Sequence, residues 1–100
     1  MHNHDERYIC ALLNRIPGVK ARLATPEEDG GPRKADVVAE YNGKTFYFQV
    51  SKQEKSKRER KKLLKRGTIP IHTHKFLGFS RSREELLAEL RRHLGCPSHI

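Results

Sequence analysis

Hydrophobic residues recur at helical spacing in two stretches of the chain, residues 5–16 and residues 82–95. The apolar positions are Tyr8, Ile9, Leu12, Leu13 and Ile16 in the first and Leu86, Leu87, Leu90 and Leu94 in the second. Because positions three and four apart share one face of a helix, both stretches predict amphipathic helices. Ser82 and Glu85 stand at the spacing of a capping box, so we expect the second helix to begin there.

Alternating apolar and polar residues predict β-strands in the middle of the chain. The strand-like runs are residues 19–24, 35–41, 44–50 and 68–79. Only Asn42 and Gly43 separate the two middle runs, and this pair favours a two-residue hairpin turn because both of its positions take positive φ. Two Pro and two Gly among charged residues predict that residues 25–34 form a loop.

The predicted hairpin also places side chains across from one another. Counting outward from a two-residue turn, Asp36 lies opposite Gln49, and opposed residues share a face of the sheet. The other face carries Val37, Ala39, Phe46, Phe48 and Val50 and is the expected core. Two oxygen ligands on rigid strands are a starting point for a Mg²⁺ site, since this ion takes few protein ligands. The alternative is an ordinary polar pair on the solvent face of the sheet.

Positive charge is concentrated in residues 52–66, where nine Lys or Arg stand against two Glu in a chain of net charge +9. Good helix formers with Leu63 and Leu64 as an apolar anchor predict a surface helix that Gly67 ends. Such a segment would neutralise phosphates and release counterions. The candidate nucleic-acid contacts are Lys52, Lys55, Lys57, Arg58, Lys61, Lys62 and Lys65. The alternative is a solvated helix face that only keeps the protein soluble.

Length and composition limit the class of protein. One hundred residues predict a single domain, residues 1–100, and 35% hydrophobic residues predict a small core of one sheet with two or three helices. No apolar run approaches the roughly 18–20 residues of a membrane span, and the N-terminus lacks the layout of a secretion signal. Two cysteines, Cys10 and Cys96, are too few for a disulfide scaffold and form no CxxC pair, so a cytoplasmic location is expected. No nucleophile role is supported for either of them.

The segment ADVVAEYNGKTFYFQVSKQ, residues 35–53, resembles the motif of the PD-(D/E)XK nucleases, also called restriction-endonuclease-like. A Gln in place of the second acid is similar to the Mrr-type restriction endonucleases, and archaeal Holliday junction resolvases have a similar hairpin. The family core has the order α-β-β-β-α-β. The elements predicted from the residues reproduce this order over nearly the whole chain, with a C-terminal helix added. We therefore expect an α/β fold, with a mixed α+β sheet, in the order α-β-β-β-α-β-α.

The same resemblance implies a function for the residues that match it. In the family the Asp and the Glu or Gln bind a divalent metal, so Asp36 and Gln49 would hold Mg²⁺ or Mn²⁺ for phosphodiester hydrolysis. The expected substrate is DNA rather than RNA. Glu6, on the first helix, is a weak match to an extra acidic residue of some members. Many nucleases of this size act as dimers, so we also expect that the protein could form a homodimer.

The lysine of the motif is displaced in this chain. The family places it two residues after the Glu or Gln, where Ser51 stands here, and the lysine follows one position later as Lys52. In a regular strand Lys52 points to the face opposite Gln49. A β-bulge at Val50 and Ser51 would turn Lys52 back to stabilise charge at the metal, or Lys55 would reach in. Otherwise the domain binds nucleic acid without cutting it.

Three functions therefore stay open: a metal-dependent endonuclease, an inactive nucleic-acid-binding module of the same fold, and a basic subunit that meets an acidic protein. Two further features are open as well. His72 and His74 would share one face of a strand and could hold a metal together, or they are polar residues near a groove or an edge. Tyr47, on the face of Asp36, could stack on a base or simply cover the sheet.

Overall fold

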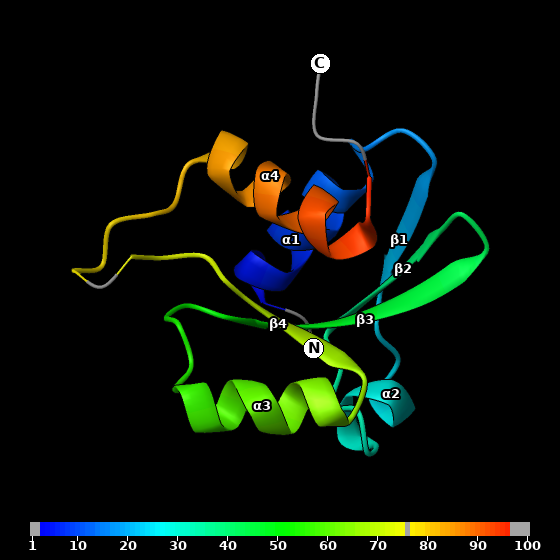
Figure 1. Ribbon diagram of the computed structural model, residues 1–100, viewed down its shortest axis with the longest axis horizontal. Helices are drawn as coiled ribbons and strands as arrows, with labels where there is room; N and C mark the ends of the chain where they lie inside the picture. The colour runs from blue at the N-terminus through cyan, green and yellow to red at the C-terminus, as the bar shows by residue number, and fades with distance from the viewer. Residues whose placement is uncertain (1–2, 76, 97–100) are drawn as a thin grey trace.

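A four-stranded mixed sheet with the order β1-β2-β3-β4 forms the centre of the structure (Figure 1). The strands are β1 (Val19–Leu23), β2 (Val37–Tyr41), β3 (Lys44–Ser51) and β4 (Thr68–His72). Neighbouring strands are antiparallel from β1 to β3, whereas β4 runs parallel to β3. The structure is a computed structural model that describes residues 3–75 and 77–96.

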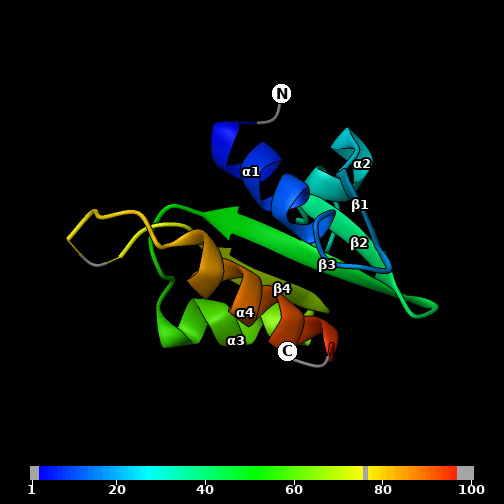
Figure 2. The ribbon, with the colours of Figure 1, turned by 90° about the horizontal axis from the view of Figure 1, so that it is seen from above.

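Helices cover both faces of this sheet. They are α1 (His4–Leu13), α2 (Pro26–Gly30), α3 (Lys57–Lys65) and α4 (Arg83–Leu94). Figures 1 and 2 show α1 and α4 together over one face and α3 under the other, beside β4. No helix in the described part of the chain is long and apolar enough to cross a membrane. The chain is thus an α+β domain with a mixed sheet.

The hydrophobic core lies between the sheet and the pair α1 and α4. Phe48, on β3, is the largest fully buried side chain. The predicted helical stripes supply much of the rest, and the buried members on these helices are Ile9, Leu12, Leu13, Leu86, Leu90 and Leu94. Leu87 is only partly buried at the border of this cluster. The two amphipathic helices predicted from hydrophobic spacing are therefore confirmed.

The predicted hairpin and its register are also confirmed. Asn42 has φ 55° and Gly43 has φ 79°, the positive values that this two-residue turn requires. Tyr41 pairs with Lys44, and the ladder continues from there to Val37 opposite Phe48. The turn type therefore determines which residues of β2 and β3 lie opposite one another and share a face of the sheet.

Two predicted boundaries are wrong. Residues 25–34 were expected to be a loop, but α2 occupies residues 26–30, so the order is α-β-α-β-β-α-β-α. Thr25 accepts the Glu28 N–H at 3.2 Å while the Glu28 side chain accepts the Thr25 N–H at 2.9 Å, a capping box that stabilises a short helix among Pro and Gly. The strand predicted over residues 68–79 ends at His72, where the chain turns into a protruding loop.

Asn14, just beyond α1, closes the outer edge of β1. Its side-chain amide donates to the Ala21 carbonyl at 3.0 Å and accepts the Ala21 N–H at 2.8 Å, as a neighbouring strand would. We expect Asn14→Ala to lower the free energy of unfolding by about 1–2 kcal/mol, because two hydrogen bonds are lost. Urea unfolding measures this, with the exposed Gln53→Ala as control. Equal stability of both variants would contradict a structural role for this contact.

Candidate functional site

Asp36 stands directly before β2, and hydrogen bonds hold it on three sides. Its backbone N–H donates to the Phe48 carbonyl at 2.8 Å, and its carbonyl accepts the Ala24 N–H at 2.9 Å. Its carboxylate oxygen Oδ2 accepts the backbone N–H of Val50 at 2.8 Å. The paired residues of β2 and β3 end at Val37 and Phe48. The bond from the Val50 N–H to the Asp36 carboxylate continues the hydrogen bonding between the two segments beyond that pair, and it fixes the side chain to the backbone of β3.

Other acids lie close to this carboxyl. Partial burial raises the pKa of Asp36, the Val50 N–H opposes that rise, and the charges of Glu6 and Asp29 add to it, so that the pKa reaches about 7. A hydrogen bond with the Asp29 side chain also favours the protonated form of Asp36 and so adds to the rise of its pKa. We call Asp36, Asp29 and Glu6 the acidic cluster. It brings together residues of α1, α2 and the start of β2.

The acidic cluster was only partly predictable. Glu6 was named only as a weak match to an extra acidic residue of the family, and in the structure its charge contributes to the raised pKa of Asp36. Asp29 was missed, because its segment was expected to be a loop. The capping-box spacing of Thr25 and Glu28 is the signal in the sequence that could have placed Asp29 on a helix.

Gln49 follows Phe48 on β3, as the register requires, but its side chain has a partner of its own. The carboxamide donates to the backbone carbonyl of Lys34 at 3.1 Å, whereas the Asp36 carboxylate binds the Val50 N–H. Within residues 3–75 and 77–96, no three His, Cys, Asp or Glu side chains converge closely enough to hold a metal ion. With the side chains in these positions, the protein therefore offers few ligands for a metal ion beside Asp36.

Lys52 lies on the side of the sheet that α1 covers. Its Nζ is 3.1 Å from Oδ2 of Asp5, near the start of α1. The pairing of β3 with β4 advances one residue at a time through Val50 and Ser51, without the two-against-one step of a bulge. The bulge proposed for these two residues is therefore not present between β3 and β4, and Lys52 lies just beyond the end of β3.

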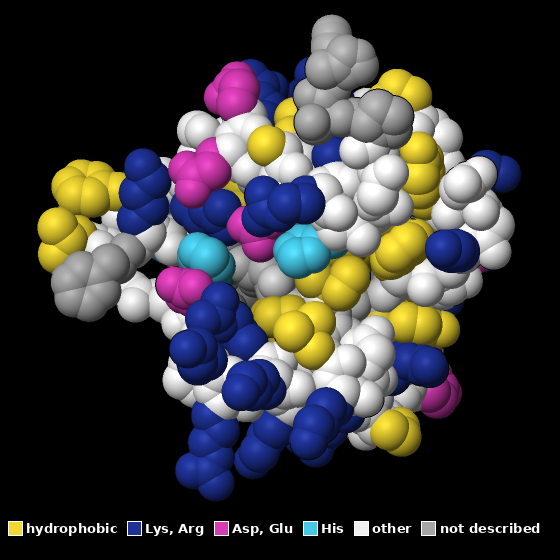
Figure 3. Space-filling view, viewed as in Figure 1, with side chains coloured by type: hydrophobic (Ala, Val, Ile, Leu, Met, Phe, Trp, Pro, Cys, Tyr) yellow, Lys and Arg dark blue, Asp and Glu magenta, His cyan; other side chains and the backbone are white. Residues whose placement is uncertain are grey.

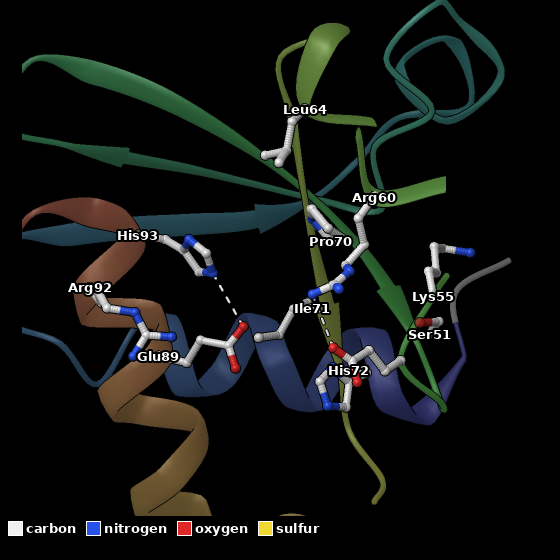
Figure 4. Close-up of a pocket in the computed structure, with 11 residues that line it drawn as sticks. Ser51, Lys55, Arg60, Leu64, Pro70, Ile71, His72, Glu89, Arg92 and His93 are labelled. Atoms are coloured by element: carbon white, nitrogen blue, oxygen red, sulfur yellow. Dashed lines mark hydrogen bonds and ion pairs between the residues drawn. The ribbon is translucent and has the colours of Figure 1, made fainter. Parts of the chain in front are cut away.

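Lys55 lies at a different place, a groove of about 300 Å³ between α3 and α4 (Figure 4). His72 lines the same groove, whereas His74 lines a second groove of about 340 Å³ together with Lys52. Burial, with the charge of Arg81 added, lowers the pKa of His72. The two histidines therefore do not share one site, and Lys55 does not line the groove in which Lys52 lies.

The basic helix is confirmed as α3, which begins at Lys57 after the N-cap Ser56. Leu63 alone is its buried anchor, since Leu64 is 56% exposed. Five side chains form an exposed surface that we call the α3 ridge: Lys57, Arg58, Lys61, Lys62 and Lys65. Figure 3 shows the basic side chains gathered over this helix. The α3 ridge is thus the helical part of the concentration of positive charge that the sequence shows in residues 52–66.

Tyr47, Cys10 and Cys96 contact other parts of the chain. The Arg33 guanidinium lies 4.4 Å from the centre of the Tyr47 ring, so this ring is covered by the chain itself on that face. Cys10 and Cys96 are partly buried against the core. Burial raises the pKa of the Cys10 thiol, which makes it a poorer nucleophile.

No family model, no curated protein and no solved structure matches this chain. The class of protein is therefore defined by its fold and surface alone: an α+β domain with a four-stranded mixed sheet, an acidic cluster beside the β2–β3 ladder and a basic helix.

Proposed function

We propose that the protein is a metal-dependent nuclease of the PD-(D/E)XK type that binds DNA through the α3 ridge and hydrolyses a phosphodiester beside Asp36. The observation that carries the proposal is the Asp36 carboxyl, tied to rigid backbone yet raised to a pKa of about 7 by burial and by neighbouring acids. Carboxyl groups crowded in this way repel one another, and a bound cation relieves that repulsion. Strongly shifted groups of this kind concentrate at functional sites.

The topology supports the same proposal. Apart from the short α2, the chain runs helix, three antiparallel strands, helix, and a fourth strand parallel to the third. This is the element order of the PD-(D/E)XK core that the motif of residues 35–53 implies. In that arrangement Asp36 precedes the second strand and Gln49 lies near the end of the third.

Carboxylate and carboxamide oxygens are of the type that a hard divalent cation binds. Asp36 and Gln49 would hold Mg²⁺ or Mn²⁺, with the remaining acidic cluster nearby, since such an ion keeps several waters. When bound, the ion polarises the phosphate and lowers the pKa of a bound water. Asp36 supplies a carboxylate because its pKa of about 7 lets it release its proton near neutral pH.

Lys52 would supply a positive charge to the phosphate in addition to that of the metal ion. Its side chain is 72% exposed, so its ion pair with Asp5 contributes little stability. The lysine can therefore exchange Asp5 for a phosphate oxygen at small cost. The α3 ridge, exposed along its length, would hold the neighbouring phosphates of the backbone.

A second candidate function is a DNA-binding module that does not cut. It is favoured by the partners that Gln49 and Lys52 already have, the Lys34 carbonyl and Asp5, both different from Asp36. In this function the acidic cluster only shapes the end of the sheet, and the α3 ridge supplies all of the affinity.

Incubation of the protein with supercoiled plasmid in Mg²⁺, Mn²⁺ or EDTA separates these functions. We expect nicking with either metal and none with EDTA, because the metal supplies the activated water. Lys52→Gln should slow nicking about 10-fold, while Lys44→Gln, an exposed lysine at the hairpin turn, should not change it. Metal-independent DNA binding without any nicking would select the binding module. Failure to bind DNA at low salt would leave an acidic protein as the partner.

A further inference from the structure

A hairpin loop projects from the structure between β4 and α4 (Figures 1 and 2). We use this name for residues 73–75 and 77–81, the described residues of that segment. Its two sides are joined by hydrogen bonds, from the Arg81 N–H to the Thr73 carbonyl at 2.8 Å and from the Lys75 N–H to the Phe79 carbonyl at 2.6 Å. His74 and Ser80 form an antiparallel bridge between these bonds. The described residues on the two sides of the hairpin loop are therefore held together by backbone hydrogen bonds.

The base of the hairpin loop is anchored to α4 through Arg81. The Arg81 side chain is only 7% exposed and forms ion pairs with Glu85 at 2.9 Å and Glu89 at 2.6 Å. It also donates to the His72 carbonyl at 3.1 Å, which ties it to the end of β4. Thr73, the partner of Arg81, is buried. The projection thus starts from a rigid base.

The outer part of the hairpin loop is apolar and exposed. Leu77 is 75% exposed and Phe79 is 68% exposed, the highest values among the large hydrophobic residues of the described chain. Figure 3 shows hydrophobic side chains at this outer end, beside a basic one. Single exposed hydrophobic residues are common, but two on one anchored projection favour an interaction surface.

Basic side chains on the same stretch of chain favour an anionic partner. Residues 60–83 contain eight Lys or Arg and no Asp or Glu. Arg60 and Arg81 are paired with acids from outside this stretch, but Lys75 of the hairpin loop and the lysines of the α3 ridge are exposed. The loop also touches the candidate site, because the His74 N–H donates to the Lys52 carbonyl at 2.7 Å. A nucleic acid whose phosphates lie along the α3 ridge would also bring its stacked bases, which are apolar, to the loop.

We propose that the hairpin loop is a wedge that inserts Leu77 and Phe79 between stacked base pairs of duplex DNA held on the α3 ridge. Apolar side chains used in this way unstack a base step and kink the duplex, which brings more of its backbone onto the protein. The anchored base suits this role, since a mobile loop would lose conformational entropy on insertion. The inference rests on the DNA binding of the proposed function and not on cleavage.

A duplex that contains 2-aminopurine tests the wedge, since this base becomes more fluorescent when it is unstacked. In EDTA, we expect the wild-type protein to raise its fluorescence several-fold and Leu77→Ser/Phe79→Ser to lose most of that rise. The double variant should also bind about 10-fold more weakly with an unchanged salt dependence, because its phosphate contacts are intact. Phe79→Leu should keep most of the response. Leu64→Ser removes an exposed leucine from α3 and is the matched control.

The other outcomes overturn the wedge in distinguishable ways. Binding by the wild type with no change in fluorescence leaves DNA binding in place and excludes insertion. No binding of any duplex at low salt removes both the wedge and the proposed function. If sedimentation shows a wild-type dimer that the double variant loses, with equal fluorescence for both, a second copy covers Leu77 and Phe79 instead. If vesicles of phosphatidylcholine and phosphatidylserine bind the wild type but not the double variant, and the two proteins give equal 2-aminopurine fluorescence, a lipid surface covers Leu77 and Phe79.

Discussion

Asp36→Asn should lower the rate of metal-dependent cleavage about 100-fold or more. The same substitution should make the protein more stable at pH 8. The loss of cleavage follows because the amide lacks the charge that holds a divalent ion. The gain in stability follows because the wild-type carboxyl is partly buried and is also close to other acids. Asparagine keeps the oxygen that accepts the Val50 N–H and can donate to Asp29, so the local hydrogen bonds survive.

The sign of the pH dependence follows from the raised pKa. Burial and the neighbouring acids raise the pKa of Asp36 from 3.8 to about 7, so the folded protein holds this proton more tightly than the unfolded chain does. The resulting stabilisation is complete below about pH 4 and is lost as the pH rises through 7. Asp36→Asn removes this loss. Because solvent screens part of the repulsion, we expect a gain of about 1–2 kcal/mol at pH 8 and almost none at pH 4.

Urea unfolding at pH 4, 6 and 8 measures the stability, and plasmid nicking in Mn²⁺ measures the cleavage. The control is Glu27→Gln, which removes an exposed acid of α2 that does not act on Asp36. A variant that loses cleavage without gaining stability would contradict the repulsion on which the site rests. Nicking at the wild-type rate would exclude Asp36 as the metal ligand.

Replacing Lys57, Lys61 and Lys65 with Gln should weaken DNA binding about 100-fold at 0.1 M salt. These residues are four apart along α3 and so share one stripe of its exposed surface. Each lysine that neutralises a phosphate releases a counterion and contributes about 0.9 to the salt slope. The triple variant should therefore also lower that slope by about 2–3.

Fluorescence anisotropy of a labelled duplex across a salt series measures both effects. The control, Arg15→Gln/Lys20→Gln/Lys44→Gln, removes the same net charge from exposed positions outside α3. We expect it to change the affinity less than about 3-fold, since distant exposed charges are screened at this salt. Equal losses for the two triple variants would mean that net charge alone attracts DNA, and the α3 ridge would not be the binding surface.

The local structure was largely predictable because it depends on contacts between close neighbours in the chain. The turn at Asn42 and Gly43 needs only two residues with positive φ, and it determines the pairing of β2 with β3. The helical stripe ending at Leu94 and the Gly95 cap need only local spacing. The capping box of Thr25 and Glu28 is equally local, and it was missed because Pro and Gly nearby favour a loop.

The candidate site was less predictable, because its chemistry depends on residues from separate elements. The register puts Asp36 across from Gln49, but it does not show that the Gln49 amide binds the Lys34 carbonyl. The raised pKa of Asp36 needs α1 and α2 to pack near the start of β2. The sequence left the direction of Lys52 open, and its partner Asp5 lies 47 residues earlier in the chain.

By itself, the sequence determined the basic helix, the hairpin register and the two amphipathic helices, since charge, turn type and apolar spacing act over a few residues. Tertiary structure alone decided the rest: that β4 is parallel to β3, that the charges of Glu6 and Asp29 act on Asp36, and that Leu77 and Phe79 stay in solvent on an anchored hairpin loop. The physical reason is the same in each case. Burial and electrostatic interaction depend on distance in space, and packing brings together groups that the chain keeps far apart.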